Sequence, residues 1–194
     1  MVLTMADTKT FLMMGAPGSG KGTQAKLLAE KVGGRVYSSG DRLREMAASG
    51  SYFGKRAQAV MSAGDLMPIW VSQYLFEEAL IALEPADAIV FEGSGRILEE
   101  AMRFHEAAQW LGRPYTAIYL EATEEHLKQR LLKRQGIEGR ADDADSALNE
   151  RFEKFRELTL QSIEYFKKEG MLVVINGEQT VEAVHTEILR ALKL

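Results

Sequence analysis

An apolar run that breaks into glycines and then into a helical pattern, FLMMGAPGSGKGTQ at residues 11–24, constrains the fold of this chain most. In a glycine-rich turn, successive backbone N–H groups point into one concavity, and the N-terminus of the following helix adds partial positive charge. Glycine permits positive φ and the close approach of oxygen atoms. Lys21 stands where the turn meets the helix. The stretch therefore predicts a strand, a phosphate-binding loop and a helix.

Short apolar runs that are typical of buried strands alternate with longer helical patterns along the chain. They cover residues 10–15, 35–39, 87–93, 115–122 and 171–177. Their near-continuous apolarity indicates burial on both faces, as in a parallel sheet. The alternation predicts an α/β fold, a doubly wound parallel five-stranded sheet, with ligands at the carboxyl ends of the strands.

Two segments interrupt this alternation. Residues 39–83 give several helical patterns in succession, and residues 134–146 are polar, contain glycine and are flanked by helical patterns. Both are interpreted as insertions over the strand ends and not as separate domains. The first is expected to cover one substrate, and the second to close as a lid.

Composition narrows the range of partners. The 194 residues include 24 Lys and Arg against 28 Asp and Glu, a formal net charge of −4, so the chain as a whole does not attract nucleic acid or an anionic membrane. There is no cysteine, which excludes disulfides, thiolate catalysis and cysteine-ligated zinc. No apolar stretch reaches the roughly 18 residues of a membrane span, and the first residues lack the apolar core of a signal peptide. We expect a cytoplasmic protein that binds neither nucleic acid nor a membrane.

Arginines gather around the polar segment. RLLKRQGIEGRADD contributes Arg130, Arg134 and Arg140, and NERFEKF contributes Arg151. Solvated helix faces are the plain alternative. Guanidinium groups bind phosphoryl oxygens in a bidentate way and stay charged, and phosphoryl transfer needs such a cationic cage.

Two carboxylates follow these arginines in the polar segment. Asp142 and Asp143 are expected to support the lid by orienting its arginines, or to cap the helix that starts near residue 144. The two roles are compatible.

Five blocks of sequence together resemble an adenylate kinase with a short lid. They are GAPGSGKGTQ, SSGDRLR, GDLMP, a GR after a strand end, and KR…GRADD…R, in family order over nearly the whole chain. The resemblance implies a single P-loop kinase domain over residues 1–194. It also implies a helical insertion at about 38–67 that binds the nucleoside monophosphate (NMP), and a short lid at about 134–144. It further implies transfer of the γ-phosphoryl group of Mg²⁺-bound ATP to AMP, giving two ADP, by a monomer that binds nucleotides alone.

The resemblance also implies the residues of the donor side. Those that wrap the ATP phosphates or lie against its adenine are Gly18, Ser19, Gly20, Lys21, Gly22, Thr23, Arg130 and Arg134. Gly22 stands directly after the lysine, so the hydroxyl expected to face Mg²⁺ comes one residue later, at Thr23. Glu92 is expected to orient the ion through bound water.

On the acceptor side, the resemblance implies a base pocket, a phosphate clamp and a catalytic cage. The NMP-binding residues are Ser39, Gly40, Arg44, Leu66, Met67, Gly93, Arg96, Glu100, Arg140 and Arg151, and the catalytic cage is Lys21, Arg96, Arg134, Arg140 and Arg151. For Leu66 and Met67, a place in the core of a helical turn is an equal alternative.

The chain departs from the family pattern after the third strand. The family usually has Asp-Gly-(Phe/Tyr)-Pro-Arg, and this chain has EGSGR at residues 92–96. Loss of the proline and the aromatic residue predicts a looser turn and a less firmly placed Arg96.

A second departure is Glu100, where adenylate kinases typically have a glutamine that contacts adenine. An ionised carboxylate only accepts hydrogen bonds, so it matches the two donors of guanine better than the edge of adenine. Alternatively, Glu100 makes a single hydrogen bond to the 6-amino group of adenine, or is rotated into solvent. Serine at position 39 does not decide the base. Three functions stay open: an AMP kinase, a kinase for GMP or a broader set of monophosphates, and a P-loop switch or sensor. Arg44 and Arg96, on the expected acceptor side, argue against the last.

Overall fold

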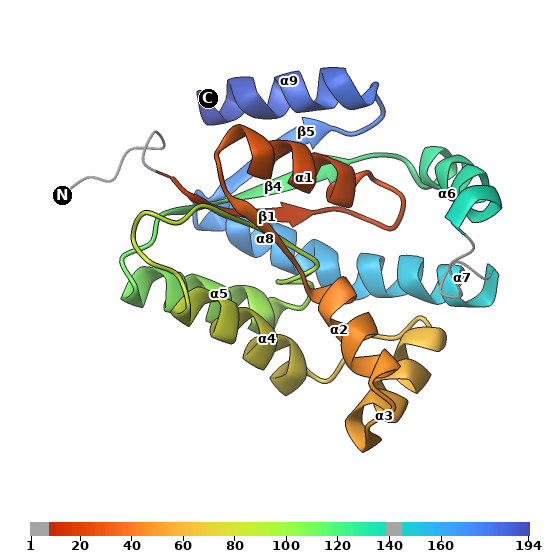
Figure 1. Cartoon of the computed structure of the whole chain (residues 1–194). Coiled ribbons are helices and arrows are strands. Elements are labelled where there is room, and N and C mark those ends of the chain that lie inside the picture. The colour runs from red at the N-terminus through yellow and green to blue at the C-terminus, as the bar shows by residue number, and fades with distance from the viewer. Residues whose placement is uncertain (1–7, 139–144) are drawn as a thin grey trace.

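The computed structural model describes residues 8–138 and 145–194, with the side chains of 133–138 and 145–147 left out. Within these residues, parallel strands form a five-stranded sheet in the order β2-β3-β1-β4-β5 (Figure 1). The strands are β1 (Thr10–Met14), β2 (Arg35–Ser38), β3 (Ile89–Glu92), β4 (Tyr115–Glu121) and β5 (Leu172–Asn176). Each lies inside its predicted run, and the predicted fold class is confirmed.

Helices cover both faces of the sheet (Figure 1). On one face, α1 (Lys21–Lys31) and α9 (Val181–Leu192) pack against Phe11 and Met13 of β1. On the other face, α4 (Ile69–Ile81), α5 (Leu98–Trp110) and α8 (Leu160–Lys168) pack against Leu12 and Met14. Every side chain of β1 is therefore buried, as expected for the central strand of a parallel sheet covered on both sides.

Two short helices, α2 (Ser39–Ala48) and α3 (Tyr52–Ser62), lie beyond the carboxyl ends of the strands (Figure 1). The side chain of Ser38 caps α2 by accepting from the backbone N–H of Asp41, and Ser51 caps α3 in the same way. A small core of their own joins them to α4; it contains Leu43, Ala57, Met67, Val71 and Leu75. These helices fall in the predicted insertion at 38–67, whose boundaries stay a prediction.

The last part of the chain continues from β4 through α6 (Glu124–Glu138) and α7 (Asp145–Lys154). A π-helical turn, η3 (Phe155–Thr159), then joins α7 to α8. Of the predicted lid at 134–144, residues 139–144 lie outside the described part of the chain. None of the described helices is long and apolar enough to cross a membrane.

Candidate active site

The loop between β1 and α1 has the backbone that its glycines predict. Gly18 and Gly20 have positive φ, 82° and 91°, and Gly20 is the N-cap of α1. No described side chain caps this helix, and its first turn contains no acidic residue. Its N–H groups and the positive end of its dipole are therefore available to an anion. The Lys21 ammonium group folds over the loop and donates to the carbonyl oxygen of Ala16 at 2.8 Å.

A cavity of about 310 Å³, called here the loop cavity, borders this loop. Its predicted lining residues are Gly18, Ser19, Gly20, Thr23 and Arg130. Arg130 donates to the carbonyl oxygens of Gly177 and Gln179 at 2.8 and 3.0 Å. Because these bonds use the edge of the guanidinium group, its flat faces can stack on an aromatic ring. The loop cavity thus offers a phosphate cradle and a stacking surface.

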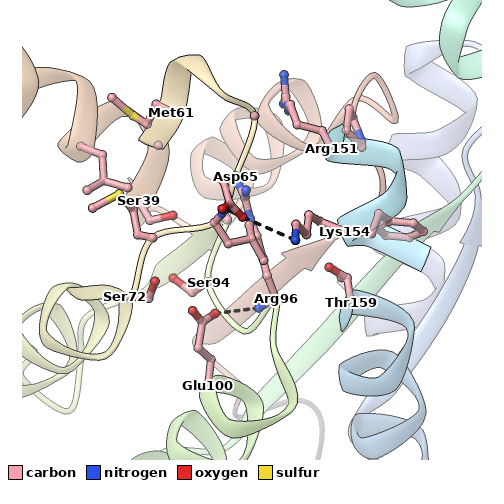
Figure 2. A pocket seen from close by; sticks show the side chains of 18 of the residues that line it. Ser39, Met61, Asp65, Ser72, Ser94, Arg96, Glu100, Arg151, Lys154 and Thr159 are labelled. Carbon is pink, nitrogen blue, oxygen red and sulfur yellow. Dashed lines mark hydrogen bonds and ion pairs between the residues drawn. The ribbon is translucent and has the colours of Figure 1, made fainter. Parts of the chain in front are cut away.

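A second cavity of about 290 Å³, called here the arginine cavity, opens between the loop, the α2–α3 hairpin, the turn after β3 and the α7–η3 segment (Figure 2). It has three kinds of lining. The cations are Lys21, Arg44, Arg96, Arg151 and Lys154; the polar side chains include Ser39, Ser72, Ser94 and Glu100; the apolar ones include Leu43, Met61, Leu66, Met67 and Leu75. In Figure 2, Arg151 and Lys154 face Ser39 and Met61 across the cavity. A phosphate ester that carries a flat ring fits this lining, with its phosphate among the cations and its ring against the apolar side chains.

The cations of the arginine cavity come from different elements of the fold. Arg44 of α2 is paired with Asp41 one turn earlier. Lys154 of α7 lies 3.4 Å from a carboxylate oxygen of Glu150 and 3.7 Å from one of Asp65 (Figure 2). The hydrogen bond that Lys154 donates to Glu150 and the charge of Asp65 raise the pKa of Lys154. The Asp65–Lys154 pair joins the segment before α4 to α7.

Glu100 lies at the base of α5 and is only 3% exposed, so the alternative that it rotates into solvent is wrong. Its Oε2 accepts from the backbone N–H of Arg96 at 2.8 Å (Figure 2). Burial raises the pKa of Glu100, while hydrogen bonds from the Ser72 hydroxyl and the backbone N–H groups of Arg96 and Ile97 oppose that rise. The carboxyl group is therefore shared between the start of the helix and the wall of the cavity.

The turn after β3 depends on two glycines. A Cβ atom at Gly93 would lie 2.6 Å from Ser39 Oγ and 2.9 Å from an Arg96 guanidinium nitrogen. Gly95 has φ 71°, which is closed to proline because its ring holds φ near −65°. Glu100 accepts from the Arg96 N–H, and Gly95 packs near Leu12 and Phe166. The expected looseness of the turn stays a prediction.

Glu92, the last residue of β3, is the described carboxylate closest in sequence to this turn. Its Oε2 accepts from the Ser38 hydroxyl at 2.9 Å. The described residues contain no cluster of three or more acidic, histidine or cysteine ligands. A Mg²⁺ ion that takes most of its ligands from phosphates and water needs only one or two protein oxygens. Glu92 and the exposed Thr23 fit that kind of site and not a closed protein cage.

Most predicted site residues come together in the two cavities. Those in the arginine cavity are Lys21, Ser39, Gly40, Arg44, Leu66, Met67, Gly93, Arg96, Glu100 and Arg151. Met67 also belongs to the small core of the hairpin, which confirms its core interpretation, and its contact with an acceptor stays a prediction. Gly22, although described, lines neither cavity.

Several predicted lid residues cannot be placed in this way. Arg140, Asp142 and Asp143 lie outside the described residues. Arg134 belongs to α6, and its side chain is outside the described part. The roles assigned to the site residues remain predictions.

Sequence reasoning missed several residues of the arginine cavity, among them Asp65, Ser72, Ser94 and Lys154. A signal existed for Lys154, which follows Arg151 by three residues on one helix and so shares its face. Ser72 follows the GDLMP block by one turn of α4. Nothing local marks Ser94 as a cavity residue.

Comparisons with known proteins all find relatives of one family. The family model described as adenylate kinase matches residues 13–171. The chain is 34% identical over 187 residues to adenylate kinase isoenzyme 1 of Cyprinus carpio, covering 96% of this chain and 95% of that one. It is 35% identical over 186 residues to adenylate kinase 1 of Schistosoma mansoni, covering 95% and 92%. It is 35% identical over 182 residues to adenylate kinase of Thermus thermophilus, covering 93% and 95%.

Proposed function

Because the chain belongs to the adenylate kinase family, we propose that it transfers the γ-phosphoryl group of Mg²⁺-bound ATP to AMP and releases two ADP. The family makes it an enzyme and a nucleoside monophosphate kinase. Its main acceptor, its metal and the roles of its residues belong to this proposal.

One observation carries the proposal: two cavities border the same phosphate-binding loop. Residues 18–20 line the loop cavity, and Lys21 lines the arginine cavity. A donor in the first cavity and an acceptor in the second would thus bring their phosphates to the two sides of one loop. A switch that hydrolyses ATP slowly needs no second cavity with several cations, so the arrangement favours transfer between two nucleotides.

The residues act by position and charge. Arg44 and Arg96 hold the acceptor phosphate, and Lys21 and Arg151 offset charge on the transferred group. Guanidinium groups stay protonated and grip two oxygens at once. The acceptor phosphate is largely a dianion at neutral pH, because its second pKa is about 6. It attacks directly and needs no general base. Closure over the site excludes water and so prevents waste of ATP by hydrolysis.

Glu92 and Thr23 would hold Mg²⁺, directly or through water, together with the nucleotide phosphates. When bound, the ion neutralises phosphate charge and orients the oxygens. The Ser38 hydroxyl keeps the Glu92 carboxylate in place. We also propose a monomer in the cytoplasm that binds no nucleic acid, on the basis of the family and the balanced charge of the chain.

The test is a direct assay of nucleoside diphosphate with Mg²⁺-bound ATP and AMP, GMP, CMP or UMP in turn. We expect two ADP for each ATP consumed with AMP. Lys21→Met should lower kcat at least about 100-fold, the usual cost of removing a group that stabilises transition-state charge.

Lys26→Met is the matched control. Lys26 lies on the same helix with its side chain exposed, so this variant should retain kcat within about twofold of wild type. Hydrolysis of ATP without phosphorylation of any monophosphate would contradict the proposal and favour the switch.

A further inference from the structure

Three oxygen-bearing side chains from three elements meet in the wall of the arginine cavity opposite Lys154 and Arg151. Ser72 comes from α4, Ser94 from the turn after β3 and Glu100 from α5. Figure 2 shows their oxygens turned toward one another. The neighbouring wall is apolar, with Leu43, Met67 and Leu75 among its residues. A flat base whose phosphate lies among the cations would present its polar edge to these oxygens.

Ser94 has an unmet hydrogen-bonding need. The residue is 4% exposed, and its Oγ is buried with no partner among the described residues. A buried hydroxyl normally has a partner, so an orphan in a cavity wall points to a ligand. Because a hydroxyl both donates and accepts, Ser94 can meet either kind of group.

Glu100 has acceptor capacity left for a ligand. Its Oε2 accepts from the Arg96 backbone N–H, and the Ser72 hydroxyl and the Ile97 N–H also donate to the carboxyl group. Because a carboxylate has about four acceptor sites, a further partner can still bind. With a proton, the carboxyl group presents one donor and one acceptor, as an amide does. Without a proton, it presents acceptors alone. The two charge states therefore read different base edges.

Adenine and guanine present edges that match these two states. Adenine presents an acceptor at N1 and a donor at its 6-amino group, as a protonated carboxyl group requires, and guanine presents two donors, N1–H and its 2-amino group, as an ionised carboxylate requires. We propose that Glu100 and Ser94 together read the acceptor base, and that protonated Glu100 selects AMP whereas ionised Glu100 selects GMP. This proposal rests on the proposed function for the place of the acceptor.

The groups that face Glu100 permit both states. The guanidinium group and N–H of Arg96, the N–H of Ile97 and the Ser72 hydroxyl favour the ionised form, and burial favours the neutral form. The other charges of the cavity come from α1, α2, the segment before α4, and α7; they are Lys21, Arg44, Asp65, Arg151 and Lys154. The acceptor base that binds can therefore determine whether the Glu100 carboxyl group carries a proton.

The first test is titration calorimetry of AMP and of GMP in two buffers of different ionisation enthalpy near neutral pH, which gives the protons taken up on binding. AMP should take up more protons than GMP with wild type, and equally many with Glu100→Gln. Protons of the nucleotide phosphate are common to both ligands and cancel. Glu99→Gln, an exposed neighbour on the same helix, should keep the wild-type difference.

The second test is the ratio of kcat/KM for AMP to that for GMP between pH 5.5 and 8.5. In wild type the ratio should fall by up to about tenfold per pH unit above the pKa of Glu100, as linkage to one proton requires. In Glu100→Gln it should be high and independent of pH. Ser94→Ala should lower kcat/KM for both acceptors.

The outcomes separate this proposal from the proposed function. Equal proton uptake for AMP and GMP in wild type, or no GMP phosphorylation at any of these pH values beside active AMP phosphorylation, would overturn base selection by Glu100. A difference in proton uptake without turnover of either acceptor would support base selection and count against the proposed function alone.

Discussion

Replacing Gly93 with alanine tests whether the glycine turn places the catalytic groups. Alanine adds a Cβ atom where the structure leaves 2.6 Å to Ser39 Oγ and 2.9 Å to an Arg96 guanidinium nitrogen. Both contacts are the ends of flexible side chains, so they can move away. Their movement displaces two groups of the arginine cavity while the surrounding core stays in place. The variant should therefore lose activity out of proportion to its loss of stability.

The magnitude follows from the backbone and from the contacts. Gly93 has φ 88°, and a side chain in the left-handed region costs about 1–2 kcal/mol. For a domain of this size, each kcal/mol lowers Tm by about 2–4 °C, so we expect a fall of about 2–8 °C. A misplacement of about 1 Å can cost about 100-fold in rate. We expect kcat/KM for AMP to fall at least about tenfold, or about 1.4 kcal/mol.

Gly112→Ala is the matched control, because Gly112 has φ 61° and a Cβ atom there would meet nothing within 4 Å. This variant has only the free-energy cost of a side chain at positive φ, without any displaced neighbour. Thermal unfolding and steady-state kinetics at a temperature well below both Tm values separate the two effects. If the two variants differ in kcat/KM by less than twofold, the turn does not place Arg96 and Ser39.

Three further predictions concern stability. Arg113 donates to one hydroxyl and two carbonyl oxygens near the amino ends of the strands. Arg113→Met should therefore lower the free energy of unfolding, measured in urea, by about 2–4 kcal/mol, and it should leave kcat within about twofold of wild type. Burial raises the pKa of Tyr37 to about 12, so the neutral phenol contributes stability below pH 10 that is lost as pH rises toward 12. Tyr37→Phe should lose about 1 kcal/mol at pH 7, where the bond to the Leu75 carbonyl oxygen is missing, and unfold less steeply with pH between 10 and 12. Asp65→Asn breaks the half-exposed pair with Lys154 and should change the free energy of unfolding by less than about 1 kcal/mol, with no difference left in 1 M salt.

The sequence was sufficient to predict the sheet and the phosphate-binding loop because their signals are local. The apolar runs are continuous, and the glycines around Lys21 have a conformational reason to be there. Ser72 and Ser94 could not be predicted as a pair, because they meet only through the packing of α4 and the turn after β3 on the sheet. The backbone of the turn after β3 could not be predicted from the family pattern, since Gly95 has a φ of 71° that proline cannot adopt.

The polar side chains in the wall of the arginine cavity destabilise the folded protein when no ligand is bound. A buried hydroxyl without a partner is destabilising by about 1–3 kcal/mol, and burial opposes the ionisation of Glu100. Apolar side chains at Ser94 and Glu100 would extend the hydrophobic core that lies beside them. Buried polar groups at a cavity wall are explained when a ligand forms hydrogen bonds with them. On this reasoning Ser94→Ala should gain stability in the absence of nucleotide and lose affinity in its presence. A residue with a purely structural role would not show that opposite pair of effects.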